Sequence, residues 1–388
     1  MSKFICSHPW THFEVNNPNG DVTMCCDNNT VLGNVNDKSI AELWNDEGFQ
    51  NIRRRMRDDG AHAICPRTCP VLNGFKTYQN LDWYTEIDTK SPARINAEQN
   101  EQEFKDGNLV LESLPRWMRY AYSYLCNLDC YHCYQREEAV EKIKLPDSFM
   151  DQVREHSENY QVLHFFGGEP FLYKPVLKMM ENIKTDKECR YFLISNATLF
   201  TDRVLAMLET KNIGHFAISL DAATESSFNL LRLKDAKSSW AEVLENTAHI
   251  AKMKKDMGFT FTISMTLNSV NHDEIERFVD LCIGFDAEPL VILVANPYQT
   301  YEFQKDFLMF ADQQINEIEE QIERSLPKVE KHGYQEAEMA LKSLQRTVRE
   351  HYKGENNTRV FVAKKYARRV FHHLPTGAQN ILRKTLQK

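Results

Sequence analysis

The stretch Cys126-Asn-Leu-Asp-Cys130-Tyr-His-Cys133 brings three cysteines within eight residues. Three thiolates at this spacing can bind three irons of a cubane iron–sulfur cluster and leave the fourth iron without a protein ligand. An open metal position is typical of a catalytic centre, whereas a structural metal site fills its positions with protein. A structural zinc site is the alternative, but its nearest further ligand, His132, lies between two of the cysteines. The stretch therefore favours a catalytic cluster.

The composition is that of an ordinary globular protein. The chain has 388 residues, 42% of them hydrophobic and 26% charged, which allows one large domain and a smaller one. No run of about 18 apolar residues and no apolar leader are found, so we expect a cytoplasmic protein without a membrane span. Ten cysteines in such a chain indicate metal binding or catalysis more than disulfides. The net charge of −8 gives no general reason to expect nucleic-acid binding.

Residues 1–75 are expected to form a small separate module. The turn signal Asn16-Asn-Pro-Asn-Gly20 predicts a β-hairpin. The other expected elements are strands at Thr11–Val15 and Asp21–Cys25, a second turn at Leu32-Gly33-Asn34, a helix capped by Ser39, and a helix over Glu47–Arg57. The run Arg53-Arg54-Arg55 is interpreted as a solvated helix face. Cys6, Cys25, Cys26, Cys65 and Cys69 gather in this module, where Cys25 and Cys26 must face opposite sides of their strand.

The rest of the chain divides into three parts. Residues 76–115 are expected to be a linker, because Glu86–Asn108 is polar and shows no periodicity. Residues 116–300 alternate between strand and helix patterns, and residues 301–388 read as helices. The predicted strands are Trp117–Tyr124, Val162–Phe166, Arg190–Ser195, His215–Leu220, Phe259–Thr266 and Leu290–Val294. Six strand–helix units predict an α/β fold with a parallel sheet.

Polar and glycine motifs follow successive predicted strands, where the carboxyl ends of a parallel sheet place its binding residues. Gly167-Gly168-Glu169-Pro170 follows the second strand, and glycines there allow backbone to approach a ligand closely. Ser195 and Asn196 end the third strand, and Ser219 and Asp221 end the fourth. Each motif alone is also typical of ordinary turns and caps. Together with the cysteine triplet they indicate one binding site.

The triplet and these motifs resemble the signatures of radical S-adenosylmethionine (radical SAM) enzymes. The resemblance implies a partial (β/α)6 TIM-like barrel with a small cluster-binding module before it and helices after it. It also implies a [4Fe–4S] cluster on Cys126, Cys130 and Cys133, with SAM on the fourth iron. The residues that the resemblance assigns to SAM binding are Gly167, Gly168, Glu169, Pro170, Ser195, Asn196, Ser219 and Asp221. Ala197 stands where the family has glycine, and Arg232 is interpreted equally as a SAM contact or an exposed arginine.

The first 75 residues are similar to the auxiliary-cluster module called SPASM, or to its shorter twitch form. The similarity rests on Cys6-Ser-His-Pro-Trp10, the Gly20-x4-Cys25 spacing, the segment Ser39–Asn45 and the pair Cys65 and Cys69. It implies one auxiliary [4Fe–4S] cluster on Cys6, Cys25, Cys65 and Cys69, with Cys26 as the spare. The module precedes the barrel here, although it usually follows it. Four thiols also suit tetrahedral zinc, which is the alternative.

The resemblance implies that the enzyme cleaves SAM reductively to a 5′-deoxyadenosyl radical, which takes hydrogen from a substrate carbon. We expect a small polar or carbohydrate substrate that is oxidised or epimerised, with maturation of a ribosomal peptide or protein as the alternative. A flavodoxin- or ferredoxin-type donor is implied. The alternative of another class is a non-catalytic metal-binding interaction protein. The basic tail beyond Leu341 is interpreted as a solvated helix face or as a surface for an anionic partner or membrane.

Overall fold

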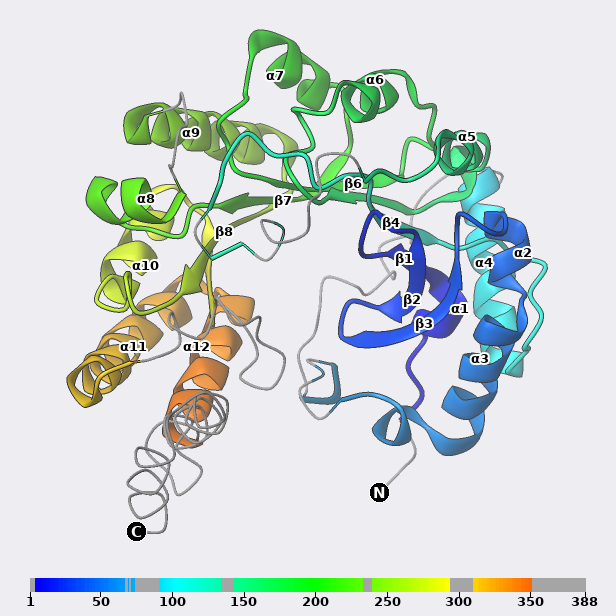
Figure 1. Cartoon of the computed structure of the whole chain (residues 1–388), viewed down its shortest axis with the longest axis horizontal. Helices are drawn as coiled ribbons and strands as arrows, with labels where there is room; N and C mark the ends of the chain where they lie inside the picture. The colour runs from blue at the N-terminus through cyan, green and yellow to red at the C-terminus, as the bar shows by residue number, and fades with distance from the viewer. Residues whose placement is uncertain are drawn as a thin grey trace, which may run out of the picture. The chain divides into compact units, whose positions relative to one another are not determined.

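The computed structural model describes residues 4–66, 69, 71–73, 91–130, 132, 133, 135, 143–232, 239–293 and 310–350 (Figure 1). The strands are β1 His12–Val15, β2 Asp21–Cys25, β3 Asn28–Asn34, β4 Trp117–Ala121, β5 Val162–Phe166, β6 Arg190–Ser195, β7 Ile213–Ser219, β8 Thr260–Leu267 and β9 Glu288–Leu293. The helices are α1 His8–Thr11, α2 Ile40–Trp44, α3 Glu47–Asp59, α4 Pro92–Asp106, α5 Asp147–Glu155, α6 Lys174–Asn182, α7 Asp202–Glu209, α8 Glu225–Arg232, α9 Trp240–Met257, α10 Ile275–Gly284, α11 Asp312–His332 and α12 Gln335–Val348.

The strands form one sheet in the order β3-β2-β1-β4-β5-β6-β7-β8-β9. Neighbours from β4 to β7 pair in parallel, and β1 also pairs in parallel with β4. β1, β2 and β3 are joined by antiparallel pairing. The predicted α/β class with a parallel sheet is thus confirmed, and the predicted bounds of β5 and β6 are those observed.

The parallel strands carry apolar residues on both faces because both faces of a parallel sheet are buried. Tyr120 of β4 faces the helices, where its ring packs edge-on against Phe149 of α5 at 5.6 Å and Phe165 of β5 at 5.4 Å. Trp117 points to the opposite face and packs against Phe192 of β6 at 4.9 Å. Because successive side chains alternate, the odd-numbered residues of β4 share this second, inner face.

The N-terminal residues extend the same sheet, which differs from the expected separate module. The register of β1 and β4 pairs Phe13 with Met118 and Val15 with Tyr120. Outside the sheet, the amide of Ile40 donates to the side chain of Gln152 in α5 at 2.7 Å. Residues 1–220 fall in one compact unit together with residues 232–263 and 285–287. The hairpin is therefore built onto the edge of the parallel strands.

The expected linker contains a packed helix, so the interpretation of Glu86–Asn108 as an exposed connector is wrong for the described residues. α4 is capped at its start by the Ser91 side chain and ends at Gly107, whose φ is +69°. Asn100 is fully buried and donates to the carbonyl of Trp10 at 2.6 Å. The helix buries asparagine and glutamate side chains that bind backbone groups, which removes the apolar periodicity that marks most helices.

The expected turn at residues 32–34 is also wrong, because these residues belong to β3. Gly33 is needed there for packing: a Cβ at this position would lie 2.4 Å from the side chain of Leu43 in α2. The helix expected after Ser39 is confirmed with a reciprocal cap, in which Ser39 accepts from the Glu42 amide and the Glu42 carboxylate accepts from the Ser39 amide at 2.8 Å.

Arg53 is buried, which corrects its assignment to a solvated face. Its Nε donates to the carbonyl of Pro9 at 2.9 Å and its Nη1 to the carbonyl of Leu109 at 2.8 Å. The guanidinium carbon lies 4.5 Å from the centre of the Trp44 ring. Arg54 is exposed, as expected. One arginine of the run therefore satisfies backbone carbonyls in the core that joins α1, α3 and the segment after α4.

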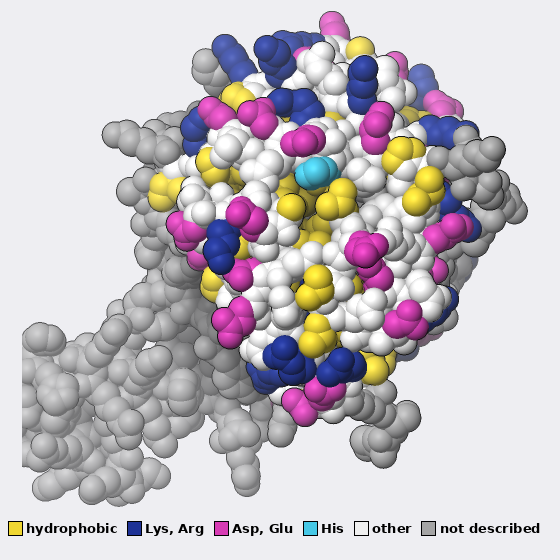
Figure 2. Space-filling view, turned by 90° about the vertical axis from the view of Figure 1, so that its right-hand side faces the viewer, with side chains coloured by type: hydrophobic (Ala, Val, Ile, Leu, Met, Phe, Trp, Pro, Cys, Tyr) yellow, Lys and Arg dark blue, Asp and Glu magenta, His cyan; other side chains and the backbone are white. Residues whose placement is uncertain are grey.

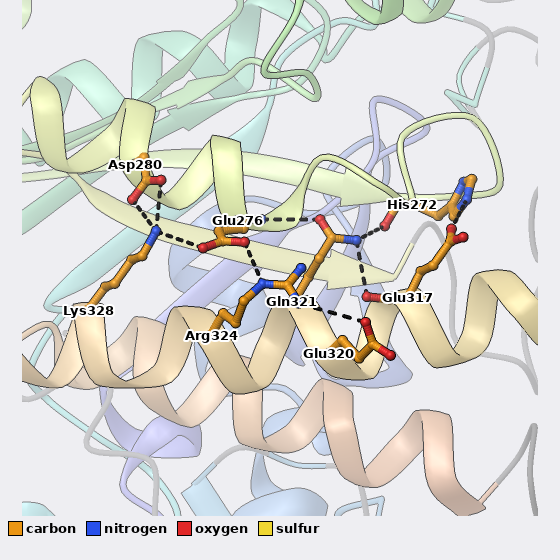
Figure 3. Close-up of polar contacts among 8 residues, drawn as sticks. All are labelled: His272, Glu276, Asp280, Glu317, Glu320, Gln321, Arg324 and Lys328. Carbon is orange, nitrogen blue, oxygen red and sulfur yellow. Dashed lines mark hydrogen bonds and ion pairs between the residues drawn. The ribbon is translucent and has the colours of Figure 1, made fainter.

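A second compact unit comprises residues 221–231, 264–284 and 288–388. It contains α8, which the sequence did not predict, together with α10, α11 and α12. Ion pairs join α10 to α11: Arg324 binds Glu276 at 2.6 Å and Lys328 binds Asp280 at 2.7 Å (Figure 3). The residues Ile315, Ile318 and Ile322 of α11 are buried. Most of the basic tail, residues 351–388, lies outside the described residues.

Charged side chains of both signs are interspersed on the face seen from the right of Figure 1 (Figure 2). Among the helices that the structure describes, none combines the length and the apolarity that a membrane crossing requires.

Replacing Arg53 by alanine is expected to lower the free energy of unfolding by about 3 kcal/mol, because two buried carbonyls lose their donor and the Trp44 contact is lost. The matched variant Arg54→Ala changes a neighbouring exposed residue and should stay within about 0.5 kcal/mol of the wild type. Urea unfolding followed by tryptophan fluorescence measures both. Equal destabilisation of the two variants would contradict the buried role of Arg53.

Candidate functional site

The cysteine triplet lies directly after β4, in the loop that leaves the carboxyl end of the strand. Cys130 is buried, and Cys126 and Cys133 are partly buried. The amide of Leu128 lies 3.5 Å from the Cys126 sulfur, and the Asn196 side-chain amide lies 3.7 Å from it. Donors at these distances can stabilise a thiolate. Burial raises the pKa of Cys126 to about 12, with further contributions from the charges of Glu169 and Cys130.

Glu169 connects the loops that follow β4, β5 and β6. Its carboxylate is buried and accepts from the Ser195 hydroxyl at 3.0 Å, the Asn196 amide at 2.8 Å and the Phe171 amide at 3.3 Å. Its own amide donates to the carbonyl of Leu125, the residue before Cys126, at 2.9 Å. Through its side chain and its backbone amide, this one residue fixes the glycine motif, the Ser195-Asn196 motif and the cysteine loop against one another.

The electrostatics of Glu169 follow from its burial. Loss of solvent raises the pKa of this carboxyl to about 7, although its hydrogen bonds and the nearby charge of Arg232 act in the opposite direction. Arg232 is itself buried, so the interpretation of it as an exposed surface arginine is wrong. The buried cation also lowers the pKa of Cys126. A positive charge near the cysteine triplet favours thiolates there.

The two glycines of the motif have positive φ angles, +88° at Gly167 and +47° at Gly168. A Cβ on Gly168 would lie 2.1 Å from the carbonyl oxygen of Leu125, and one on Gly167 would lie 2.8 Å from the Cβ of Ala121. β4 and the loop after it thus approach the glycine backbone too closely for any side chain. Ala197 has φ of +58°, a conformation that glycine adopts at lower cost.

Several polar residues complete the site although sequence reasoning did not single them out. Asn127 binds the Thr198 hydroxyl at 2.8 Å and accepts from Asn196 at 3.1 Å. Asn246 of α9 donates to the carbonyl of Ala197 at 2.7 Å. The position of Asn127 inside the cysteine triplet was an available signal, whereas Asn246 lies far away in the sequence and carried none.

Ser219 and Asp221 end β7 on either side of a unit boundary. Ser219 lies in the first unit and is partly exposed. Asp221 lies in the second unit, has φ of +61°, and accepts from the Thr266 amide at 2.7 Å. Its backbone carbonyl accepts from Asn271 at 2.8 Å. Within its own unit, Asp221 is thus bound to the end of β8 and to the loop after it.

Hydrogen bonds join the segments that carry three of the four cysteines expected to hold an auxiliary cluster. The amide of Ala61 donates to the Phe4 carbonyl at 2.9 Å, and the amide of Cys65 donates to the Ala61 carbonyl at 2.8 Å. Asn28, which pairs with Cys25, donates to the Ile64 carbonyl at 3.3 Å. These contacts join the segments that carry Cys6, Cys25 and Cys65.

The thiols of this group affect one another's ionisation. The Cys65 thiol donates to the Cys69 sulfur, which lowers the pKa of Cys69 to about 6 and raises that of Cys65. The charges of Cys6 and Cys25 contribute to the raised pKa of Cys65. Burial raises the pKa of Cys6 to about 11. Cys26 is exposed, and its thiol donates to the Asp27 carboxylate at 3.7 Å.

The donor sets fit iron–sulfur clusters. The first group offers three thiols and the second four, and thiolates are the usual ligands of iron–sulfur clusters. A cubane binds each thiolate to a different iron, so its ligands need not converge on one point. Among the described residues, no three His, Cys, Asp or Glu side chains converge to hold a single metal ion.

Comparison with known proteins agrees with this site. Residues 120–282 match the family model of the Radical SAM superfamily. Residues 6–70 match the SPASM model, an iron–sulfur cluster-binding domain. The chain therefore contains a radical SAM domain, with a SPASM domain before it. These domains imply a [4Fe–4S] cluster, an auxiliary cluster and SAM.

Solved structures with a similar fold include anSMEcpe with bound AdoMet, at 16% identity and a TM-score of 0.41, with 55% of this chain and 58% of that chain covered. SuiB of Streptococcus suis bound to its precursor peptide SuiA is similar at 13% identity and a TM-score of 0.43, with 84% and 71% covered. The methyltransferase TsrM of Kitasatospora setae is similar at 13% identity and a TM-score of 0.37, with 45% and 36% covered. The chain thus spans less than two thirds of anSMEcpe.

Gly168→Ala is expected to displace the loop before Cys126 and to remove the irons that this loop holds, about half of the total. Gly258→Ala is the matched control, since Gly258 also has a positive φ, +77°, but nothing lies within 4 Å of an added Cβ. The control should lose about 1 kcal/mol of stability and no iron. Iron analysis of anaerobically purified protein measures the difference, and full iron in Gly168→Ala would contradict the close contact.

The raised pKa of Glu169 predicts that the free energy of unfolding depends on pH. A carboxyl with a raised pKa stabilises the folded state fully below its unfolded pKa of about 4.3, and this contribution is lost as pH rises through about 7. Glu169→Gln cannot ionise, so its stability relative to the wild type should improve by about 2–3 kcal/mol between pH 5 and pH 8. Chemical unfolding without SAM measures this change. The exposed control Glu181→Gln, whose pKa is lowered by Arg203, should show none.

Proposed function

We propose that Cys126, Cys130 and Cys133 hold the catalytic [4Fe–4S] cluster and that the enzyme abstracts hydrogen from a carbon of its substrate. The observation that carries the proposal is the direct link from Glu169 to the cysteine loop and to Ser195 and Asn196. When bound and reduced, the cluster supplies the electron that cleaves SAM to methionine and a 5′-deoxyadenosyl radical.

The chain's own residues position SAM in this proposal. The residues proposed to contact it are Gly167, Gly168, Glu169, Pro170, Ser195, Asn196, Ser219 and Asp221. The buried Glu169 carboxylate is the natural partner for the SAM ammonium group, because an opposite charge stabilises its ionised form. Asn196 donates both to the Glu169 carboxylate, through its backbone, and towards the Cys126 sulfur, through its side chain. In this proposal Asn196 therefore holds the cluster and SAM in a fixed position relative to each other.

We propose that Cys6, Cys25, Cys65 and Cys69 hold the auxiliary [4Fe–4S] cluster and that Cys26 does not. The influence of Cys69, Cys6 and Cys25 on the pKa of Cys65 supports the choice of these four thiols, since each must lose its proton when a cluster binds. A cluster held by these cysteines would supply an acceptor for one electron of the substrate radical, and loss of that electron together with a proton would complete a net oxidation. A flavodoxin- or ferredoxin-type donor and a reducing, cytoplasmic environment suit both clusters.

We infer that the substrate is a peptide or a protein segment. The SPASM domain supports this inference, because relatives with auxiliary clusters modify ribosomal peptides and proteins. SuiB itself is described with its precursor peptide bound. Such relatives also include enzymes that oxidise or epimerise sugars and cyclitols, so a small polar substrate remains the second candidate.

The substrate class is tested by measuring 5′-deoxyadenosine release from reduced enzyme, SAM and size-separated cell extract. Stimulation by a fraction above about 1 kDa that protease treatment abolishes would support a peptide. Stimulation that resides in the smaller fraction and survives protease would support the second candidate instead.

The cluster assignments are tested by single replacements of neighbouring cysteines. Cys126→Ala should release no 5′-deoxyadenosine after reduction with dithionite and should retain about four of about eight irons. Cys25→Ser should lose the other four irons, whereas Cys26→Ser should keep all of them. Colourless wild-type protein that contains zinc would instead favour a non-catalytic metal-binding protein.

A further inference from the structure

A charged pair crosses the junction between the N-terminal hairpin and the parallel strands. The register of β1 and β4 places Glu14 opposite Arg119, and the Arg119 Nη1 lies 3.2 Å from the Glu14 carboxylate. The same nitrogen also donates to the side chain of Asn16. The Glu14 side chain is 1% exposed and the Arg119 side chain 15% exposed. The pair is therefore shielded from solvent, and its charges act over longer distances than surface charges do.

The proposed auxiliary ligand Cys25 shares the face of the sheet on which this pair lies. Glu14 pairs with Thr23 in the antiparallel ladder of β1 and β2, and Cys25 follows Thr23 by two residues. Residues two apart on a strand face the same side, and diagonal neighbours across a ladder lie about 7–8 Å apart. Asn16 closes the group by donating to the Thr23 hydroxyl at 2.8 Å.

Glu14 and Arg119 carry opposite charges and lie side by side at 3.2 Å. A cluster bound by Cys25, on the same face of the sheet, would therefore experience the two charges with opposite signs.

The reduction potential of an iron–sulfur cluster depends on nearby net charge, on hydrogen bonds to its sulfurs and on exposure. Reduction adds one negative charge, so a nearby cation favours the reduced cluster and a nearby anion disfavours it. We propose that Glu14 and Arg119 set the reduction potential of the auxiliary cluster, with Arg119 raising it and Glu14 lowering it. This inference rests on the proposed assignment of Cys25 as a cluster ligand.

Arg119 also lies in β4, the strand that precedes the proposed catalytic cysteines. Its guanidinium carbon lies 3.9 Å from the centre of the Phe166 ring, and Phe166 directly precedes Gly167 of the glycine motif. The position of this cation is therefore fixed by β4 and β5, whereas the cluster it acts on is held by the hairpin. Arg119 is a positioning residue in this proposal and touches no reacting atom.

The test is a redox titration at pH 8, followed by EPR, of full-length holoenzyme variants. Glu14→Gln should raise the midpoint potential of the auxiliary cluster and Arg119→Gln should lower it. Each change is expected to alter the reduction equilibrium about tenfold, which equals 59 mV for a one-electron couple. The double variant should lie close to the wild type. Full-length protein with Cys126, Cys130 and Cys133 changed to alanine isolates the auxiliary signal and serves as a second background.

The matched control removes an exposed ion pair of the same type. Arg203 and Glu181 join α6 and α7 at 2.6 Å, and Arg203→Gln or Glu181→Gln should leave the potential unchanged. The single variants could lose iron. In that case, a double variant that keeps its cluster at the wild-type potential would support the proposal. A double variant that also loses the cluster would overturn it. Unchanged potentials, or shifts of the same sign, in iron-replete single variants would also overturn it. Absence of a second cluster from the wild type would instead refute the proposed function.

Discussion

The structure of the site depends on one buried carboxylate. Glu169 accepts three hydrogen bonds from the loops after β5 and β6, and its backbone fixes the residue that precedes Cys126. An ionised carboxylate in a buried position needs such donors, because its desolvation is otherwise costly. The three loops are therefore constrained together. A flexible cysteine loop could not hold a cluster in a fixed position relative to SAM. The proposed reaction therefore depends on this constraint.

A second constraint is the continuity of the sheet. β1 pairs with β4, so the hairpin that carries Cys25 and the strand that leads to Cys126 are hydrogen-bonded neighbours. The SPASM domain precedes the radical SAM domain in this chain, yet its hairpin and the parallel strands form one unit. The relative position of the two groups of thiols is thus set by strand register, which is more rigid than a linker would be. The buried Glu14–Arg119 pair lies at this joint.

The sequence predicted those features that follow from local pattern. Short, mostly apolar runs placed β5 and β6 correctly, and the capping signal at Ser39 was read correctly. Prediction from the sequence failed where contacts between residues far apart in the chain override the local preference for a structure. α4 buries Asn100 against a carbonyl of α1, and Gly33 lies in a strand because Leu43 leaves no space for a side chain. The burial of Arg53 and Arg232 likewise depends on segments far away in the sequence, which no local window reveals.

The central claim is that three thiolates leave one iron of the catalytic cluster open to SAM. ENDOR spectroscopy of reduced, iron-replete enzyme with SAM labelled by 15N at its amino group tests this claim most directly. The account predicts a 15N hyperfine coupling to the cluster that is lost when Gly168 is replaced by alanine. A wild-type cluster that shows no coupling at saturating SAM would contradict it.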